Sequence, residues 1–519
     1  MAAAKATTGT AGALTLHFAL GLVVSILDVG ISRRAWVRAL GVAALAGSGA
    51  GTAACRGAVP AAARRPVDLR LLADPTTGRG ARVDAWQRRF GAASGVRLSV
   101  QALPGQQPFA PPPAHEALAA LAADPQAGHV LWLDHDDVLL LATARALRGL
   151  SGLARRDRYD FKRFMPVALQ PAYGLDGQLY ALPEEVDAGQ VYFIRQHFEE
   201  AGVDYARAGF DFEQPEMTWE ALRLADLDLL ASGRGRLPFH PGEPAAPLEL
   251  WGWQNGGEWL AGGGRRVTFT RPENVAALAW LAAHAREVAG AGLFPAGVFP
   301  PPARFGGGPD QVAAHPFLTG RVSICIESTR FVSVVAGAHA DFPLGYVEVP
   351  RRFPGWHLLT TTHATGYALL AGAPDVAWQA LRFLVSEDAA VADASATAQK
   401  QPRAGPAPPD AAPGAAAEPG RPLWFPAFTG QLVVDRRLAE LYQTGRKGFD
   451  EARAHGLEQL RHGYRRPPAV APEAVWPLLE EARQAALFEQ RPPLAALQEA
   501  ERAAQARLDK AWGTLEPVS

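Results

Sequence analysis

The amino-acid sequence predicts an α/β protein with a parallel sheet, because strand and helix patterns alternate through the first part of the chain. Residues 67–73, 96–102 and 129–133 are short apolar or alternating runs of the kind found in strands. Between them, residues 78–94 and 115–123 carry apolar residues at helical spacing. Strand, helix, strand, helix, strand indicates parallel strands joined by crossover helices. Ligands of such sheets lie beyond the carboxyl ends of the strands.

The later part of the chain continues the pattern and then changes character. Residues 190–195 and 322–327 predict two more strands, and residues 272–289 predict an amphipathic helix. Residues 402–423 are almost wholly Pro, Ala and Gly, which is typical of an extended or flexible linker. The remainder, residues 429–512, has a helical pattern with a proline-rich break. We therefore expect a helical C-terminal extension behind a linker.

Length and composition restrict the class of protein. The 519 residues are too many for one hydrophobic core and fit two or three domains. The 51 basic and 52 acidic residues nearly cancel, so no basic excess indicates a nucleic-acid partner. Two cysteines, Cys55 and Cys325, exclude a disulfide framework and a cysteine-based zinc site. The thirteen histidines form no His-Glu-x-x-His motif, and we expect neither a metal nor a cofactor.

The first 55 residues are typical of an export signal. Arg33 and Arg34 open an apolar, Ala- and Gly-rich stretch that ends in small residues before Cys55. The paired arginines resemble the twin-arginine export motif. The small residues before Cys55 resemble a lipobox, although Thr52 stands where Leu is usual. We expect residues 1–55 to be a signal, Cys55 to be lipidated, and the protein to lie at the outer face of the cytoplasmic membrane or in the periplasm; the alternative is a cleaved signal without lipid.

Several segments, in the same order, resemble motifs of family 1 of the bacterial extracellular solute-binding proteins, the maltose-binding-like group. Residues 160–183 resemble the family's "DF…DGKLYGLP", residues 191–203 its "LYYNKDLFEEAGL", and residues 217–222 its "KTWDEL". Further matching segments are residues 254–258, 316–323 and 365–368. The resemblance spans roughly residues 66–403 and, more loosely, the helical tail, and it is strong because six such segments occur in the same order.

The resemblance implies a two-lobed periplasmic-binding-protein fold of type II, whose lobes are joined by hinge strands and close on a ligand. It places the N-terminal lobe at residues 66–187 and 328–360. It places the C-terminal lobe at residues 188–327 and 361–519, which include the linker and the helical tail. The expected lobe crossings lie near residues 187–192, 327–330 and 358–362.

The function that the resemblance implies is binding rather than catalysis. Such a protein is the extracytoplasmic substrate-binding subunit of an ATP-driven (ABC) importer, and captures a sugar or oligosaccharide for a membrane permease. The chain has no Gly-x-x-x-x-Gly-Lys-Ser/Thr motif, so the ATPase would be a separate protein. We expect a monomer.

Candidate ligand residues combine flat apolar side chains with polar groups, as a sugar site requires. They are Trp251, Trp253, Gln254, Asn255, Asp136, Glu327, Arg330, Trp356, His363 and Thr77.

Each candidate also has a structural alternative. Trp251 and Trp253 could be packed in a core, and Asp136 could cap a helix. Arg330 stands where the family often has an aromatic residue, which favours an acidic sugar or a phosphate ester unless Arg330 pairs with Glu327. For the acidic group at residues 184–187 we expect solvated surface.

Three other functions stay open at this point. The chain could bind a phosphate ester or a polyamine, or it could serve a sensor instead of an importer, since one fold supports many functions. An exported carbohydrate hydrolase would need two carboxylates that face each other across a cleft, and Asp136 and Glu327 are the pair available.

Overall fold

The computed structural model describes most of the chain between the N-terminal apolar segments and the C-terminus. The described residues are 67–73, 78–91, 95–102, 128–211, 217–233, 237–239, 246–289, 315–338, 343–356, 358–400, 425–464, 467 and 469–515. The export signal with Cys55, the predicted helix at 115–123, Thr77 and the linker 402–423 lie outside these residues.

A mixed nine-stranded sheet runs through both halves of the molecule, with the strand order β2-β1-β3-β10-β4-β8-β5. Its first part consists of β1 (Val67–Leu72), β2 (Val96–Gln101), β3 (Val130–Asp134), β10 (Thr360–Leu369) and the beginning of β4 (Ala181–Ile194). β1 pairs in parallel with both β2 and β3, which confirms the predicted parallel arrangement. β10 is antiparallel to its neighbours β3 and β4.

Helices cover this first part of the sheet and form the first lobe with it. They are α3 (Gly78–Trp86), α6 (Val138–Thr143), α7 (Ser151–Arg156), α8 (Pro166–Leu169), α15 (Ala377–Leu384), α16 (Glu387–Ala398) and α17 (Leu432–Leu441). The core of the lobe is formed by residues of β1 and β3 and by the apolar face of α15. Trp378 and Leu381 of α15 are fully buried there. Burial of such a continuous apolar cluster is the main stabilising contribution to the lobe.

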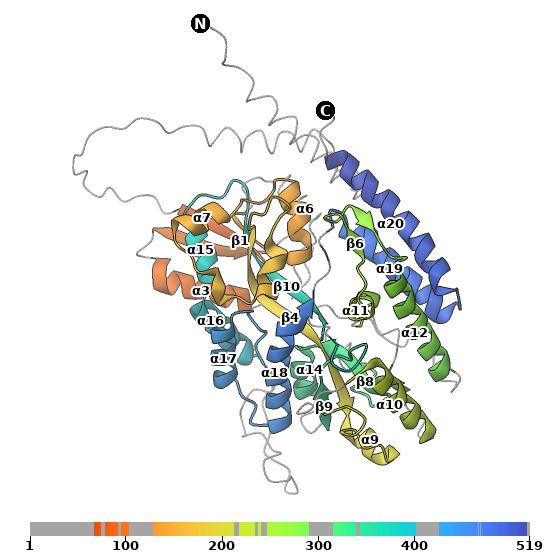
Figure 1. Ribbon diagram of the computed structural model, residues 1–519. Helices are drawn as coiled ribbons and strands as arrows, with labels where there is room; N and C mark the ends of the chain where they lie inside the picture. The colour runs from red at the N-terminus through yellow and green to blue at the C-terminus, as the bar shows by residue number, and fades with distance from the viewer. Residues whose placement is uncertain are drawn as a thin grey trace, which may run out of the picture.

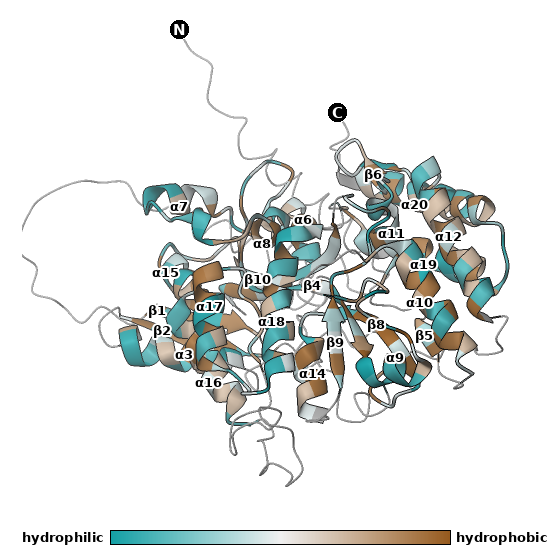
Figure 2. Ribbon diagram, turned by 60° about the horizontal axis from the view of Figure 1, so that its bottom comes forward, coloured by the Kyte–Doolittle hydropathy of each residue, from teal (hydrophilic) through white to brown (hydrophobic). Residues whose placement is uncertain are grey.

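The second lobe is built on the other end of β4. Its strands are β5 (Leu237–Phe239), β8 (Val322–Ser328) and β9 (Leu344–Val347), with a small hairpin of β6 (Leu260–Ala261) and β7 (Arg266–Val267). Its helices are α9 (Arg195–Ala201), α10 (Trp219–Ala231), α11 (Leu248–Gln254), α12 (Pro272–Ala289), α14 (Phe331–Ala338), α19 (Pro472–Phe488) and α20 (Pro493–Leu515). In Figure 2, α14 is mostly hydrophobic, whereas α7 at the periphery of the first lobe is mostly hydrophilic.

Strand β4 belongs to both lobes. Its residues Ala181–Ala188 pair with β10, and its residues from Gly189 onward pair with β8 and β9. Figure 1 shows β4 and β10 passing between the two groups of helices. The two-lobed α/β fold with joining strands is therefore as predicted from the sequence.

The division of the chain between the lobes differs from the sequence expectation. Residues 361–398 were expected in the second lobe, but β10, α15 and α16 pack in the core of the first. The reason is that β10 inserts between β3 and β4 and brings the following helices with it. Conversely, residues 331–336 and 344–346 pack against Tyr192 and Cys325 of the second lobe, although they were expected in the first.

The C-terminal tail is likewise shared between the lobes. α17 packs on α16 of the first lobe, and α19 and α20 pack on the core of the second. Between them, α18 (Lys447–Gln459) lies along the joining strands, and the short strand β11 (Gly463–Tyr464) pairs in parallel with β10. The tail thus reaches the place where the chain crosses between lobes.

Gly366 of β10 tests how tightly the joining strands pack. A Cβ atom at this position would lie 2.3 Å from the carbonyl oxygen of Leu182 and 2.4 Å from Nε2 of His135. We expect Gly366→Ala to destabilise the protein by about 1–3 kcal/mol, because backbone must move to admit the methyl group. Gly372→Ala, where a Cβ meets nothing within 4 Å, is the matched control. Urea unfolding of both variants measures the difference, and equal stability would show that the strand pair is not tightly packed there.

Candidate ligand-binding site

The joining strands have two chemically different faces at the lobe crossing. Side chains alternate between the faces of a strand, and Asp187 is in register with His363 while Val186 is in register with Ala364. Val186 and Ala364 pack against Leu457 of α18 in one buried cluster. We call this side the covered face. The opposite side carries Glu185, Asp187 and His363, and we call it the polar face.

Asp134 and His363 form a close pair on the polar face. The Oδ2 atom of Asp134, at the end of β3, lies 2.6 Å from Nε2 of His363. Burial disfavours the charge on each group, but the partner outweighs it, so the pKa of His363 is raised and the pKa of Asp134 is lowered. The other oxygen of Asp134 accepts a 2.8 Å hydrogen bond from the backbone N–H of Asp136. The Asp134 carboxylate is therefore fixed in position, and each partner favours the charged form of the other.

Asp187 lies beside His363 on the polar face. Its residue surface is only 9% exposed, and burial raises the pKa of its carboxyl against the opposing effect of His363 and Arg330. A carboxylate in such surroundings accepts hydrogen bonds strongly, because little water competes for its oxygens. Asp187 therefore offers a fixed acceptor beside the Asp134–His363 pair.

Arg330 reaches the same face from the segment that follows β8. Its Nη1 atom lies 3.0 Å from Oε2 of Glu185. Burial opposes the charge on Glu185, yet Arg330 and then Arg79 lower its pKa, so the pair is ionic. Arg330 therefore pairs with Glu185 and not with Glu327.

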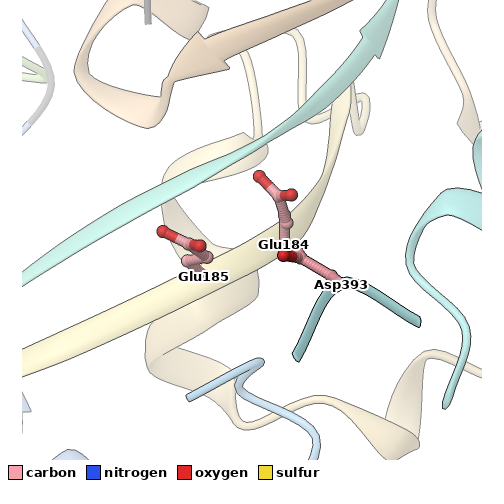
Figure 3. A group of neighbouring side chains, drawn as sticks. All are labelled: Glu184, Glu185 and Asp393. Carbon is pink, nitrogen blue, oxygen red and sulfur yellow. The ribbon is translucent and has the colours of Figure 1, made fainter. Parts of the chain in front are cut away.

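The ion pairs continue from the polar face into the first lobe. A register shift near Thr365 inserts Glu184 as an extra residue in β4, and a bulge of this kind redirects side chains. Figure 3 shows Glu184 and Glu185 on β4, with Asp393 approaching from α16. Arg79 Nη2 lies 2.9 Å from Glu184, and Arg82 Nε lies 2.7 Å from Asp393.

This network corrects the expectation that the acidic group is solvated surface. Glu184 is 1% exposed and Asp187 is 9% exposed. Among the described residues, the carboxylate oxygens of Glu184, Glu185 and Asp393 approach to within 4.8 Å, which a metal ion could bridge. The guanidinium groups of Arg79, Arg82 and Arg330 already pair with these three carboxylates, so their charge is balanced without a cation.

The two tryptophans expected to contact ligand are buried instead. Trp251 is fully buried in the second core, where its ring lies 5.4 Å from that of Trp280. Trp253 is 3% exposed, and its ring centroid lies 4.7 Å from that of Tyr464. Helix α11 directs both rings inward, because an apolar face of this helix packs on α12 and α19.

Gln254 and Asn255, at the end of α11, are occupied by structural hydrogen bonds. Gln254 accepts from Trp219 Nε1 at 2.8 Å and donates to the carbonyl oxygen of Leu359 at 3.0 Å. Asn255 donates to the carbonyl oxygen of Glu273 at 2.7 Å and accepts from Arg352. Both therefore position α11 within the second lobe.

Glu327 lies on the covered face. It is in register with Gln190, whose side chain donates to a carbonyl of α18, and its Oε1 atom is 3.4 Å from Nε2 of His315. Trp356 is 44% exposed and contacts Phe353 edge-on in the second lobe. Of the predicted site residues, the structure thus brings Arg330 and His363 to the polar face, and Asp136 lies close enough to His363 to raise its pKa.

Sequence analysis missed three residues that belong to the polar face or its edge. Asp134 ends a predicted strand, a position that already indicated a site wall. Asp187 was assigned to surface because its burial depends on the partner strands. Tyr464 lies in the tail, and no local pattern indicates that its strand pairs with β10.

The Asp134–His363 pair predicts a pH-dependent contribution to stability. The pKa of His363 is raised from 6.5, so the pair is fully formed below pH 6.5 and weakens as pH rises through the higher folded-state pKa. The pKa of Asp134 is lowered from 3.8, so its contribution is present above pH 3.8. We expect the stability difference between the wild type and His363→Gln to be largest between these values and to shrink at alkaline pH. Thermal unfolding from pH 4 to 9 measures it; a difference that does not change with pH would contradict the ion pair.

Within the described residues, no helix is both long enough and apolar enough to cross a membrane. No family model and no curated protein sequence matches the chain. Solved structures do match it over most of its length.

Three of these structures illustrate the likeness. A cyclic alpha-maltosyl-1,6-maltose binding protein from Arthrobacter globiformis has a TM-score of 0.60 at 18% identity, covering 85% of this chain and 99% of its own. The maltose-bound MalE3 of T. maritima has 0.58 at 16% identity, with 85% and 99% coverage. The GacH receptor of Streptomyces glaucescens, solved unliganded and with acarbose, has 0.57 at 14% identity, with 85% and 98% coverage. The chain therefore has the two-lobed type II fold of the maltose- and oligosaccharide-binding proteins, which confirms the resemblance read from its sequence motifs at the level of the fold.

Proposed function

We propose that this protein is the extracytoplasmic substrate-binding subunit of an ABC importer, and that it captures a sugar or oligosaccharide between its lobes. The observation that carries the proposal is the polar face at the lobe crossing, in a fold that solved structures use to hold maltose and acarbose. It acts as a monomer, and delivers its ligand to a membrane permease with a separate ATPase.

The chemistry of the polar face suits hydroxyl groups. The carboxylates of Asp134, Asp136 and Asp187 accept hydrogen bonds from hydroxyls, and His363 and Arg330 are the donors nearby. The ion pairs hold these groups in place before ligand arrives, which lowers the ordering cost of binding. A polar ligand without net charge then meets fixed partners of both kinds.

The charged groups at the lobe crossing also bear on the alternative functions, which are phosphate-ester binding, polyamine binding and glycan hydrolysis. Arg330, the residue that favoured a phosphate ester, is compensated by Glu185. The hydrolase alternative required Asp136 and Glu327 to face each other, but Glu327 lies on the covered face. A polyamine is the second candidate, because carboxylates outnumber cations on the polar face.

Ligand binding is tested by a thermal-shift screen followed by calorimetry. The panel contains maltotriose, mannotriose, a cyclic glucan, glycerol 3-phosphate and spermidine. A ligand at a thousand times its Kd adds about 4 kcal/mol of stability, a readily measured shift. We expect a saccharide to bind; a shift with spermidine or glycerol phosphate alone would overturn the sugar assignment.

The polar face is tested by Asp187→Asn. We expect this variant to bind the saccharide roughly tenfold or more weakly, because a hydrogen bond to a charged group contributes about 1.5–3 kcal/mol. Asp228→Asn, at an exposed position of α10, is the matched control and should bind like the wild type. Equal affinities for all three proteins would place the ligand away from Asp187.

We propose further that the protein is exported and anchored through a lipid on Cys55. The support is the arginine pair and the small residues before Cys55 in the sequence. In a bacterial host, the wild type should incorporate an alkyne fatty acid and have its mature N-terminus at residue 55. Cys55→Ser should incorporate none. An unlabelled wild-type protein that is still processed would indicate a cleaved signal without lipid.

A further inference from the structure

The tail of the chain contributes one aromatic side chain to the polar face. Strand β11 pairs in parallel with β10, and Tyr464 is in register with Thr361. Residues in register on adjacent strands direct their side chains to the same face of a sheet. Thr361 and His363 are two residues apart on β10, so they also share a face. Tyr464 therefore lies on the side of the sheet that carries His363 and Asp187.

Tyr464 is held rigidly on that face. Its hydroxyl donates a 2.9 Å hydrogen bond to Oε1 of Glu258, which fixes one end of the side chain. Its ring packs on Trp253 at 4.7 Å between centroids, with the planes tilted by 54°. Trp253 is 3% exposed, whereas Tyr464 is only partly buried. The buried tryptophan thus supports an accessible tyrosine, and supports it from the core of the second lobe.

We propose that Tyr464 is the aromatic platform of the ligand site, on which the apolar face of a saccharide ring packs. The inference rests on the proposed function and names a further specificity-determining residue. Two residues of strand separate Thr361, beside Tyr464, from His363, a distance of about 6.6 Å. That separation is comparable with the size of one sugar ring. A ring that packs on Tyr464 therefore presents its edge hydroxyls to His363 and the carboxylates.

In this arrangement both lobes and the tail supply or support residues of the ligand site. Tyr464 is backed by Trp253 and Glu258 of the second lobe, while His363 is paired with Asp134 of the first. The Thr362 hydroxyl donates to the carbonyl oxygen of Tyr464 at 3.5 Å, so β11 is tied to the crossing strand itself. The platform is therefore fixed relative to the polar groups across the lobe crossing.

The test uses isothermal calorimetry of the full mature protein with maltotriose and mannotriose. We expect Tyr464→Ala to weaken binding of the saccharide that the wild type binds by roughly tenfold or more, as loss of an aromatic anchor does. Tyr464→Phe retains the ring and should stay within about threefold of the wild type. Tyr442→Ala removes another half-buried tyrosine with a hydrogen-bonded hydroxyl, to Ser395 on α16, and should not alter the affinity.

A second variant and a second readout separate recognition from folding. Tyr464→Leu preserves apolar bulk and should bind as weakly as the Ala variant, while its melting temperature without ligand stays near that of the wild type. Saturation-transfer NMR should show aromatic contact with sugar ring protons in the wild type, and less in the Leu variant. A wild type that binds a saccharide with no loss in the Ala and Leu variants overturns the platform alone. A wild type that binds no saccharide overturns both this inference and the proposed function.

Discussion

The pairing of β4 with β10 is the constraint on which the rest of the structure depends. A single 14-residue strand supplies backbone hydrogen bonds to both lobes, and β10 returns the chain along it. Every buried backbone group on these strands needs a partner, so the lobes cannot be rearranged without breaking the ladder. Asp187 and His363 lie side by side on one face because of this register, and a slip of β4 by one residue would move Asp187 to the covered face, away from His363.

The same pairing explains why so many charges are buried at the crossing. The polar face is enclosed by elements of both lobes, so Asp187 and Asp134 lose most of their contact with water. Isolated buried charges are unfavourable, and pairs such as Asp134–His363 and Glu185–Arg330 offset the cost of their burial. Replacing such pairs by apolar residues often leaves stability unchanged, so stability alone does not account for them. Their fixed hydrogen-bonding groups suit recognition of a polar ligand.

The two faces of the crossing strands have different roles: one packs against a helix, and the other carries the polar groups. On the covered face, α18 packs against Val186 and Ala364 with apolar contacts. On the polar face, the first lobe supplies Asp134, the crossing supplies Asp187 and His363, and the tail supplies Tyr464. The tail is therefore more than an extension of the second lobe. Its helix α18 packs on one face of the crossing strands, and its strand β11 brings Tyr464 to the other.

Local pattern in the sequence determined the alternation of strands and helices, the parallel pairing of β1, β2 and β3, and the motif order that identified a two-lobed fold. It also indicated Asp136, Arg330 and His363, because each lies at a strand end or crossing. Only the tertiary structure decided that Trp251 and Trp253 are buried, that Glu327 lies on the covered face, and that Tyr464 joins β10. Burial and facing depend on which distant segments pack together, and β10 is paired with segments more than 170 residues earlier and about 100 residues later. A local pattern carries no information about such partners.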